Sequence, residues 1–165
     1  MSTADAPDRP LPLIPGPAPR LLCIQAPYYA QILAGMLAGA RELADQAGAA
    51  LEVVDVAGAF ELPAALRMAI EANGEGPARR WDGFLILGCV VKGETDHYDH
   101  ICREACSGVM AIAAATGLPV GFGLLTVHSL AQAEARAAPG PGNKGREAMF
   151  ALLSQLALRR RWGLA

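Results

Sequence analysis

The segment GETDHYD, at residues 93–99, combines residues that can bind an anion and move a proton. It follows an apolar run and precedes a helical pattern, so backbone N–H groups would stand free at a helix start. Such a turn can hold a phosphate, with Gly93 letting the anion approach the backbone and Thr95 adding a hydroxyl. His97 can transfer a proton near neutral pH, because its unperturbed pKa is about 6.5. An N-capping turn followed by a solvent-facing histidine explains the same residues equally well.

A second polar turn, GAFELP at residues 58–63, follows another apolar run. Glu61 can accept hydrogen bonds from a polyol, although a loop that places a carboxylate at the positive end of a helix is the simpler explanation. Arg136 either grips a phosphate with its guanidinium or compensates the dipole of a short helix. Tyr28 is either a core aromatic or a plate on which a flat heterocycle stacks.

Two further patterns suggest ligands that the rest of the sequence does not favour. The letters GPGNKG at 140–145 match a dinucleotide-binding pattern, but they follow a helix instead of a strand, so we reject that reading. His97, His100, Cys102 and Cys106 are candidate zinc ligands, and residues four apart share one face of a helix. No second pair with ligand spacing follows them, and we therefore expect no metal site.

The apolar pattern predicts the elements that must position these groups. Short apolar or β-branched runs predict strands at 21–24, 51–56, 84–91 and 119–126. Helical spacing predicts helices at 29–47, 62–72, 97–116, 130–137 and 144–161, the fourth of them capped by Ser129. Breaks rich in Gly and Pro separate elements at 73–80 and 139–142.

This alternation of strands and helices predicts an α/β fold. Each pair of strands is separated by too much chain for a hairpin, so the strands should run parallel. We expect a three-layer sandwich: a four-stranded parallel sheet with helices on both faces. The run FLILGCVV at 84–91 is typical of a central strand covered on both faces. Ligands of such folds bind beyond the carboxyl ends of strands, which is where the turns at 93–96 and 126–128 lie.

Composition and charge limit the possible functions. The 165 residues suffice for one domain, which we place at 21–165, after a proline-rich flexible arm at 1–20 that holds six of the twelve prolines. A net charge of −2 argues against a nucleic-acid partner. No uninterrupted apolar run of about 18 residues is present to span a membrane, so we expect no membrane partner.

The first residues lack the layout of a secretory signal, so we expect a cytoplasmic protein with reduced cysteines. Cys23 and Cys89 lie in apolar runs and should be small buried side chains. Hydrophobic residues make up 53 % of the chain, which is a large apolar surplus for a small monomer. A homo-oligomer is the simplest way to bury it.

The order of the motifs adds to these individual signals. GAFELP, GCVVKGETDHYD, GFGLLT, EAR and GNKG follow one another between residues 21 and 161. In that order they resemble the lumazine synthase family of riboflavin biosynthesis. The resemblance implies a flavodoxin-like fold and a transferase that needs no cofactor. Its substrates would be 5-amino-6-(D-ribitylamino)uracil and 3,4-dihydroxy-2-butanone 4-phosphate, and its products 6,7-dimethyl-8-ribityllumazine, phosphate and water. A shell-forming or flavin- or lumazine-binding paralogue with little synthase activity is the alternative.

The resemblance also implies a role for individual residues. His97 matches the proton-transfer histidine, and Arg136 matches the cation that binds the phosphate. The other matching positions bind substrate: the phosphate turn Gly93, Glu94 and Thr95; the ribityl-binding Ala59, Phe60 and Glu61; Val90 and Val91 through their backbone; Phe122 and Lys144 on the pyrimidine side; and Tyr28 as the stacking aromatic. Tyr28 replaces the family's usual phenylalanine, and Asp96 stands where a small or neutral residue is common.

The resemblance finally implies an assembly. Family members place their active sites between neighbours in a pentameric ring, so Phe122, Arg136 and Lys144 would act across an interface from His97. Shell-forming relatives use the amino-terminal arm to add a strand to a neighbour's sheet, which requires backbone N–H donors. The arm of this chain contains Pro7, Pro10, Pro12, Pro15, Pro17 and Pro19, which have none. We therefore expect a pentamer or a decamer and no sixty-subunit shell.

Overall fold

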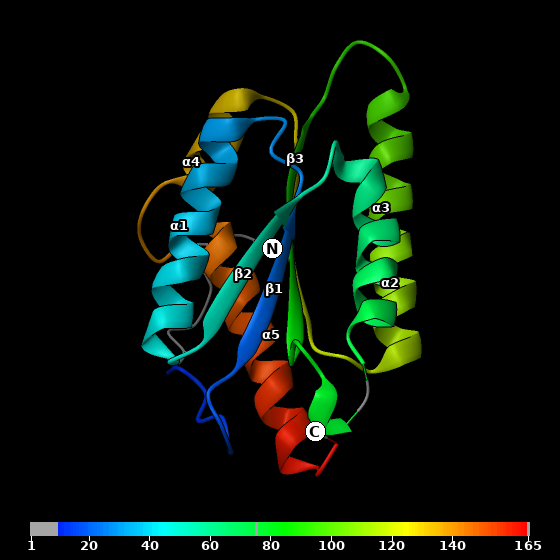
Figure 1. Ribbon diagram of the computed structural model, residues 1–165. Helices are drawn as coiled ribbons and strands as arrows, with labels where there is room; N and C mark the ends of the chain where they lie inside the picture. Colours follow the sequence, from blue (N-terminus) through cyan, green and yellow to red (C-terminus); the bar gives the residue numbers. More distant parts are fainter. Residues whose placement is uncertain (1–9, 75, 165) are drawn as a thin grey trace.

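The four strands form one sheet in which all strands run in the same direction. They are β1 Arg20–Gln25, β2 Ala50–Asp55, β3 Gly83–Val91 and β4 Val120–Val127, in the order β2-β1-β3-β4. The computed structural model describes residues 10–74 and 76–164, and Figure 1 shows their arrangement. The first nine residues of the expected proline-rich arm lie outside the described residues. The predicted parallel pairing is confirmed for all three neighbouring strand pairs.

Within the described residues, five α-helices cover the two faces of this sheet. Helices α1 (Ala30–Gln46), α4 (Leu130–Ala137) and α5 (Lys144–Arg161) pack on one face, and α2 (Leu62–Ala72) and α3 (His97–Thr116) pack on the other (Figure 1). The apolar side chains of β1 and β3 alternate between the two resulting cores, as the pleat of a strand requires. The expected three-layer α/β sandwich is therefore confirmed.

The two strands that matter most for the site differ in burial. From Gly83 to Cys89 every residue of β3 is buried, because helices cover both of its faces. β4 is an edge strand that pairs only with β3, from Phe84–Val120 to Val91–Val127. From Gly121 to Val127 its residues alternate between buried positions on the α5 face and half-exposed or exposed positions on the opposite face. One face of β4 therefore remains open near Phe122.

Local signals explain where the helices begin and end. The Ser129 hydroxyl accepts a hydrogen bond from the Gln132 N–H and caps α4, as predicted. Gly117 ends α3 with a φ of 61°, a left-handed conformation that favours glycine. Two three-residue 3₁₀ helices, η2 (Ala59–Glu61) and η3 (Gly76–Ala78), were not predicted, because a single turn is too short to show a period.

The described part of the proline-rich segment lies against the domain. Leu11 and Ile14 contact the core beneath α1 and α5. The guanidinium of Arg160 donates hydrogen bonds to the carbonyls of Pro15, at 2.9 Å, and Pro17, at 2.6 Å. Residues 11–17 are thus attached to the end of α5.

None of the helices in the described residues combines the length and the apolar character that crossing a membrane requires.

Candidate active site

The predicted turns lie where β2 and β3 end. Ala59, Phe60 and Glu61 form η2, which packs against α3 and β3, and the Phe60 side chain is 56 % exposed. Val90 and Val91 end β3 half-buried, and Gly93, Glu94 and Thr95 form the exposed connection to α3. At the upper right of Figure 1 this connection arches over the first turn of α3. Sequence and structure therefore agree that these turns meet solvent at the carboxyl ends of the strands.

His97 is the first residue of α3, and its side chain is exposed. The Asp96 carbonyl accepts hydrogen bonds from the N–H groups of Asp99 and His100, but the Asp96 side chain caps none of the N–H groups of the first turn. This end of the helix keeps the partial positive charge of its free amides. The arrangement can hold an anion beside a histidine that exchanges protons with a bound molecule.

Tyr98 holds the start of α3 against the sheet. Its ring meets the His128 ring edge-on, with the centroids 6.2 Å apart, and the Lys92 ammonium lies 5.8 Å from its centroid. Burial raises the pKa of the Tyr98 hydroxyl. Groups from the ends of β3 and β4 thus fix the helix turn that carries His97.

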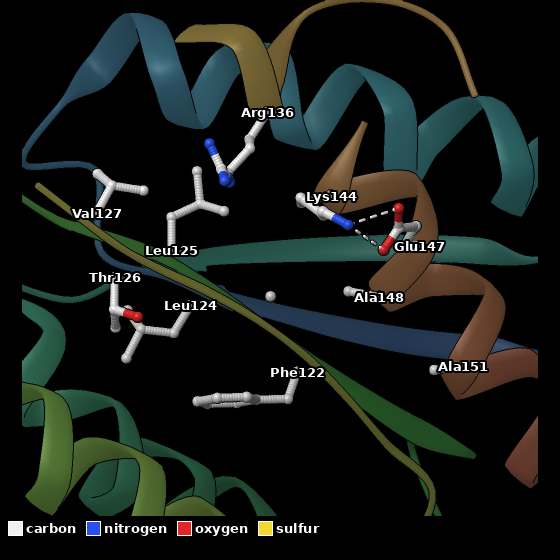
Figure 2. Close-up of a pocket in the computed structure, with 11 residues that line it drawn as sticks. Phe122, Leu124, Leu125, Thr126, Val127, Arg136, Lys144, Glu147, Ala148 and Ala151 are labelled. Atoms are coloured by element: carbon white, nitrogen blue, oxygen red, sulfur yellow. Dashed lines mark hydrogen bonds and ion pairs between the residues drawn. The ribbon is translucent and has the colours of Figure 1, made fainter. Parts of the chain in front are cut away.

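A cavity of about 420 Å³ opens at the exposed edge of β4. Arg136, from the last turn of α4, and Lys144, the first residue of α5, both line it. Figure 2 shows the Lys144 ammonium directed at the Glu147 carboxylate beside it. The Phe122 ring lies on the opposite side and is 38 % exposed. Two cations and an aromatic face therefore share one hollow, which suits a ligand that is both anionic and flat.

Neighbouring groups orient both cations. The Arg136 guanidinium donates a hydrogen bond of 2.9 Å to the Gln132 carbonyl one turn earlier in α4. The Lys144 ammonium donates to both carboxylate oxygens of Glu147, at 2.7 and 2.6 Å. The charged end of each side chain is thus hydrogen-bonded to its own helix, which orients it before a ligand arrives.

Only three of the thirteen predicted site residues line this cavity: Phe122, Arg136 and Lys144. The other ten, including His97 and the η2 residues, do not. Tyr28 precedes α1, is 77 % exposed, and meets the Tyr29 ring edge-on at 5.1 Å between centroids. Within one chain the structure therefore divides the predicted site into two groups, one at the β4 edge and one beyond the ends of β1, β2 and β3.

The sequence interpretation missed two residues beside Lys144. Glu147 also lines the cavity, and its spacing of three residues from Lys144 on a helix was a usable signal. Asn143 is buried between α1, α4 and α5, and no local pattern indicates that its amide is buried.

The cysteines give no support to a zinc site. Among the described residues, no three His, Cys, Asp or Glu side chains form a group that could hold a metal ion. Burial raises the pKa values of the Cys102 and Cys106 thiols, and it raises that of Cys23 to about 12 and that of Cys89 to about 11. These groups are therefore neutral thiols at physiological pH.

Comparison with known proteins connects these features to one family. A family model described as 6,7-dimethyl-8-ribityllumazine synthase matches residues 18–160. The synthase of Paramagnetospirillum magneticum is 44 % identical over 147 residues, which cover 88 % of this chain and 98 % of that protein. Those of Azorhizobium caulinodans and Methylorubrum extorquens are each 42 % identical, over 86 % and 95 % of this chain and 87 % and 91 % of theirs.

Proposed function

The chain belongs to the 6,7-dimethyl-8-ribityllumazine synthase family, and we propose that it carries out this synthesis at sites shared by two copies of the chain. The substrates are 5-amino-6-(D-ribitylamino)uracil and 3,4-dihydroxy-2-butanone 4-phosphate. An amine of the pyrimidine forms an imine with the ketone and releases one water. Phosphate is then eliminated, and ring closure releases a second water and gives the lumazine. The sequence motifs that led to this expectation lie within the matched residues 18–160.

One observation supports a shared site more than any other. The cations Arg136 and Lys144 lie with Phe122 in the cavity at the β4 edge, whereas His97, Phe60 and Glu61 lie outside that cavity in the same chain. The reaction needs a cation that binds the phosphate and a group that transfers protons, and both must act on the same bound substrates. The two groups must therefore lie in one site. A second copy placed against the β4 edge would supply the missing group.

Each residue then has a defined task. The Arg136 guanidinium binds the phosphate with two parallel hydrogen bonds and stabilises the charge that grows as the phosphate leaves. Lys144 and Phe122 hold the pyrimidine, the ammonium by charge and the ring by stacking. From the neighbouring copy, Glu61 and Phe60 bind the ribityl chain, and His97 exchanges protons with the reacting nitrogen and oxygen atoms.

The exposed surface favours a ring of such copies, a pentamer or a pair of pentamers. Only Ala105 and Val109 of the twenty α3 residues are buried, although the helix is rich in alanine. A second hollow, of about 580 Å³ and mostly apolar, lies between α3 and β4 and is lined by Met110, Val120 and Phe122 among others. Small side chains let helices from several copies approach closely and would remove this apolar surface from water.

We place the protein in the cytoplasm. All four cysteines are free thiols, which suits a reducing compartment.

The activity is tested by mixing the purified protein with both substrates and following lumazine formation by absorbance. We expect turnover that is saturable in each substrate. A protein that binds the lumazine product but forms none from the substrates would instead be a binding paralogue.

A further inference from the structure

The side chain of Asn143 connects three helices in the wall behind the cavity. It is 2 % exposed, although its amide is strongly polar. Its Nδ2 group has two hydrogens, which it shares among three backbone carbonyls: those of Gly35 at 3.0 Å, Ala137 at 2.8 Å and Ala138 at 3.1 Å. Its Oδ1 atom accepts from two backbone N–H groups, those of Gly145 at 2.9 Å and Arg146 at 3.1 Å. The buried amide therefore uses both its donor and its acceptor groups.

These hydrogen bonds join the backbone positions next to the two cations of the cavity. Ala137 directly follows Arg136 at the end of α4, and Asn143 directly precedes Lys144 at the start of α5. The loop between α4 and α5, residues 138–143, is rich in Gly and Pro. Without the hydrogen bonds of Asn143, this loop alone would not fix the distance between the two helix ends. We propose that Asn143 is a positioning residue that sets the separation of Arg136 and Lys144 and thereby the geometry of the anion site.

The proposal rests on the proposed role of Arg136 and extends it to a residue that touches no substrate. An N-cap alone would need only the Oδ1 atom, which satisfies the first N–H groups of α5. The three donated hydrogen bonds have another effect, because they fasten the end of α4 and the middle of α1 to the same side chain. Arg136 is assigned to the phosphate of one substrate and Lys144 to the pyrimidine of the other, and two molecules that react with each other must be held at a fixed separation.

Glycines in α1 and α5 make the space for this arrangement. A Cβ atom at Gly39 would collide with the Asn143 amide, and one at Gly145 would collide with the Met36 carbonyl. A Cβ at Gly35 would lie 2.5 Å from the Ala137 carbonyl, one of the acceptors of the Asn143 amide. Asn143 and Gly145 of the GNKG motif, which we do not interpret as dinucleotide-binding, are thus explained by close helix packing.

The test separates capping from positioning with Asn143→Ser. Serine is a good N-cap and keeps the net charge, so α5 still begins correctly, but its short side chain cannot reach the Gly35 carbonyl. Asn73→Ser is the matched control. Asn73 is also 2 % exposed and bonds with the backbone of Trp81, at 2.9 and 2.8 Å. Unlike Asn143, which directly precedes Lys144, it is not next to a residue that lines the cavity. Both variants should lose stability.

The readout is inhibition of the full-length enzyme by inorganic phosphate, together with KM for each substrate. In Asn143→Ser we expect the inhibition constant of phosphate and KM of the butanone phosphate to rise about tenfold, the loss of roughly one charge-assisted hydrogen bond. KM of the pyrimidine should change less, and Asn73→Ser should leave all three values as they are. Equal effects of the two variants, or no effect of Asn143→Ser, would overturn the proposal.

Gly39→Ala provides a second test that removes no hydrogen-bonding group. The added methyl presses on the Asn143 amide, so we expect the same selective rise in the phosphate inhibition constant, and an unchanged constant would also overturn the proposal. Arg136→Ala distinguishes the two levels of inference. If it leaves phosphate inhibition unchanged, the proposed anion site itself is wrong. If Arg136→Ala abolishes inhibition by phosphate while Asn143→Ser and Gly39→Ala are inhibited as strongly as the unmodified enzyme, only the positioning role is wrong.

Discussion

The Lys144 ammonium lies within 2.7 Å of both carboxylate oxygens of Glu147, one turn further along α5. This ion pair places a negative charge at the edge of a cavity that we assign to a phosphate-bearing substrate. The carboxylate orients the lysine, but it also reduces the attraction of the cavity for an anion.

Neutralising Glu147 should therefore strengthen anion binding. In Glu147→Gln we expect the inhibition constant of inorganic phosphate to fall by about 2–5-fold, the effect of less than about 1 kcal/mol expected for a partly exposed pair. Glu71→Gln is the control, because Glu71 forms a comparable pair with Arg67, at 2.9 Å, on α2. Weaker inhibition in Glu147→Gln would show that the carboxylate matters only by holding Lys144 in place.

Replacing His97 tests the proton-transfer role. His97→Ala should lower kcat about 10²-fold, the lower end of what general acid–base catalysis contributes. Because the side chain is exposed at the start of α3, the thermal midpoint should change by less than about 3 °C. His100→Ala, also exposed and one turn further along α3, is the control and should keep normal turnover. A normal kcat in His97→Ala would remove this residue from the mechanism.

Arg136 should be sensitive to geometry as well as to charge. Arg136→Lys keeps the positive charge but loses the planar guanidinium, so KM for the butanone phosphate should rise. Arg136→Ala should raise it further, while KM for the pyrimidine changes little. Steady-state kinetics with each substrate varied in turn measures both values. A change confined to the pyrimidine would mean that Arg136 does not bind the phosphate.

Sequence patterns predicted the elements well because these elements depend on local periodicity. The strand at 84–91 and the helices at 62–72, 97–116, 130–137 and 144–161 lie within one residue of their observed bounds. The role of Asn143 could not be predicted, because one of its acceptors belongs to Gly35, more than one hundred residues earlier. Within one chain, Phe122, Arg136 and Lys144 lie in a different place from His97, and this depends on tertiary structure. No local pattern indicated it, and only the family resemblance suggested that these residues act across a subunit interface.

The mass of the assembly tests the expectation for residues 1–20. Pro12, Pro15, Pro17 and Pro19 have no N–H to donate to a neighbouring strand, and the carbonyls of Pro15 and Pro17 already accept from Arg160. Sedimentation should therefore give roughly five or ten times the chain mass of 17.2 kDa, a closed ring or a pair of rings. Particles of about sixty chains would show that these prolines do not prevent shell formation.

Subunit complementation tests the shared site most directly. At a butanone phosphate concentration far below the KM of Arg136→Ala, the variants His97→Ala and Arg136→Ala should each be nearly inactive alone, since every site lacks one required group. When the two variants are co-expressed in equal amounts, roughly a quarter of the sites in mixed rings should combine an intact His97 from one copy with an intact Arg136 from its neighbour. We therefore predict that lumazine formation recovers to about one quarter of the unmodified rate per chain. Mixed assemblies with no more activity than either variant alone would contradict a site formed by two copies.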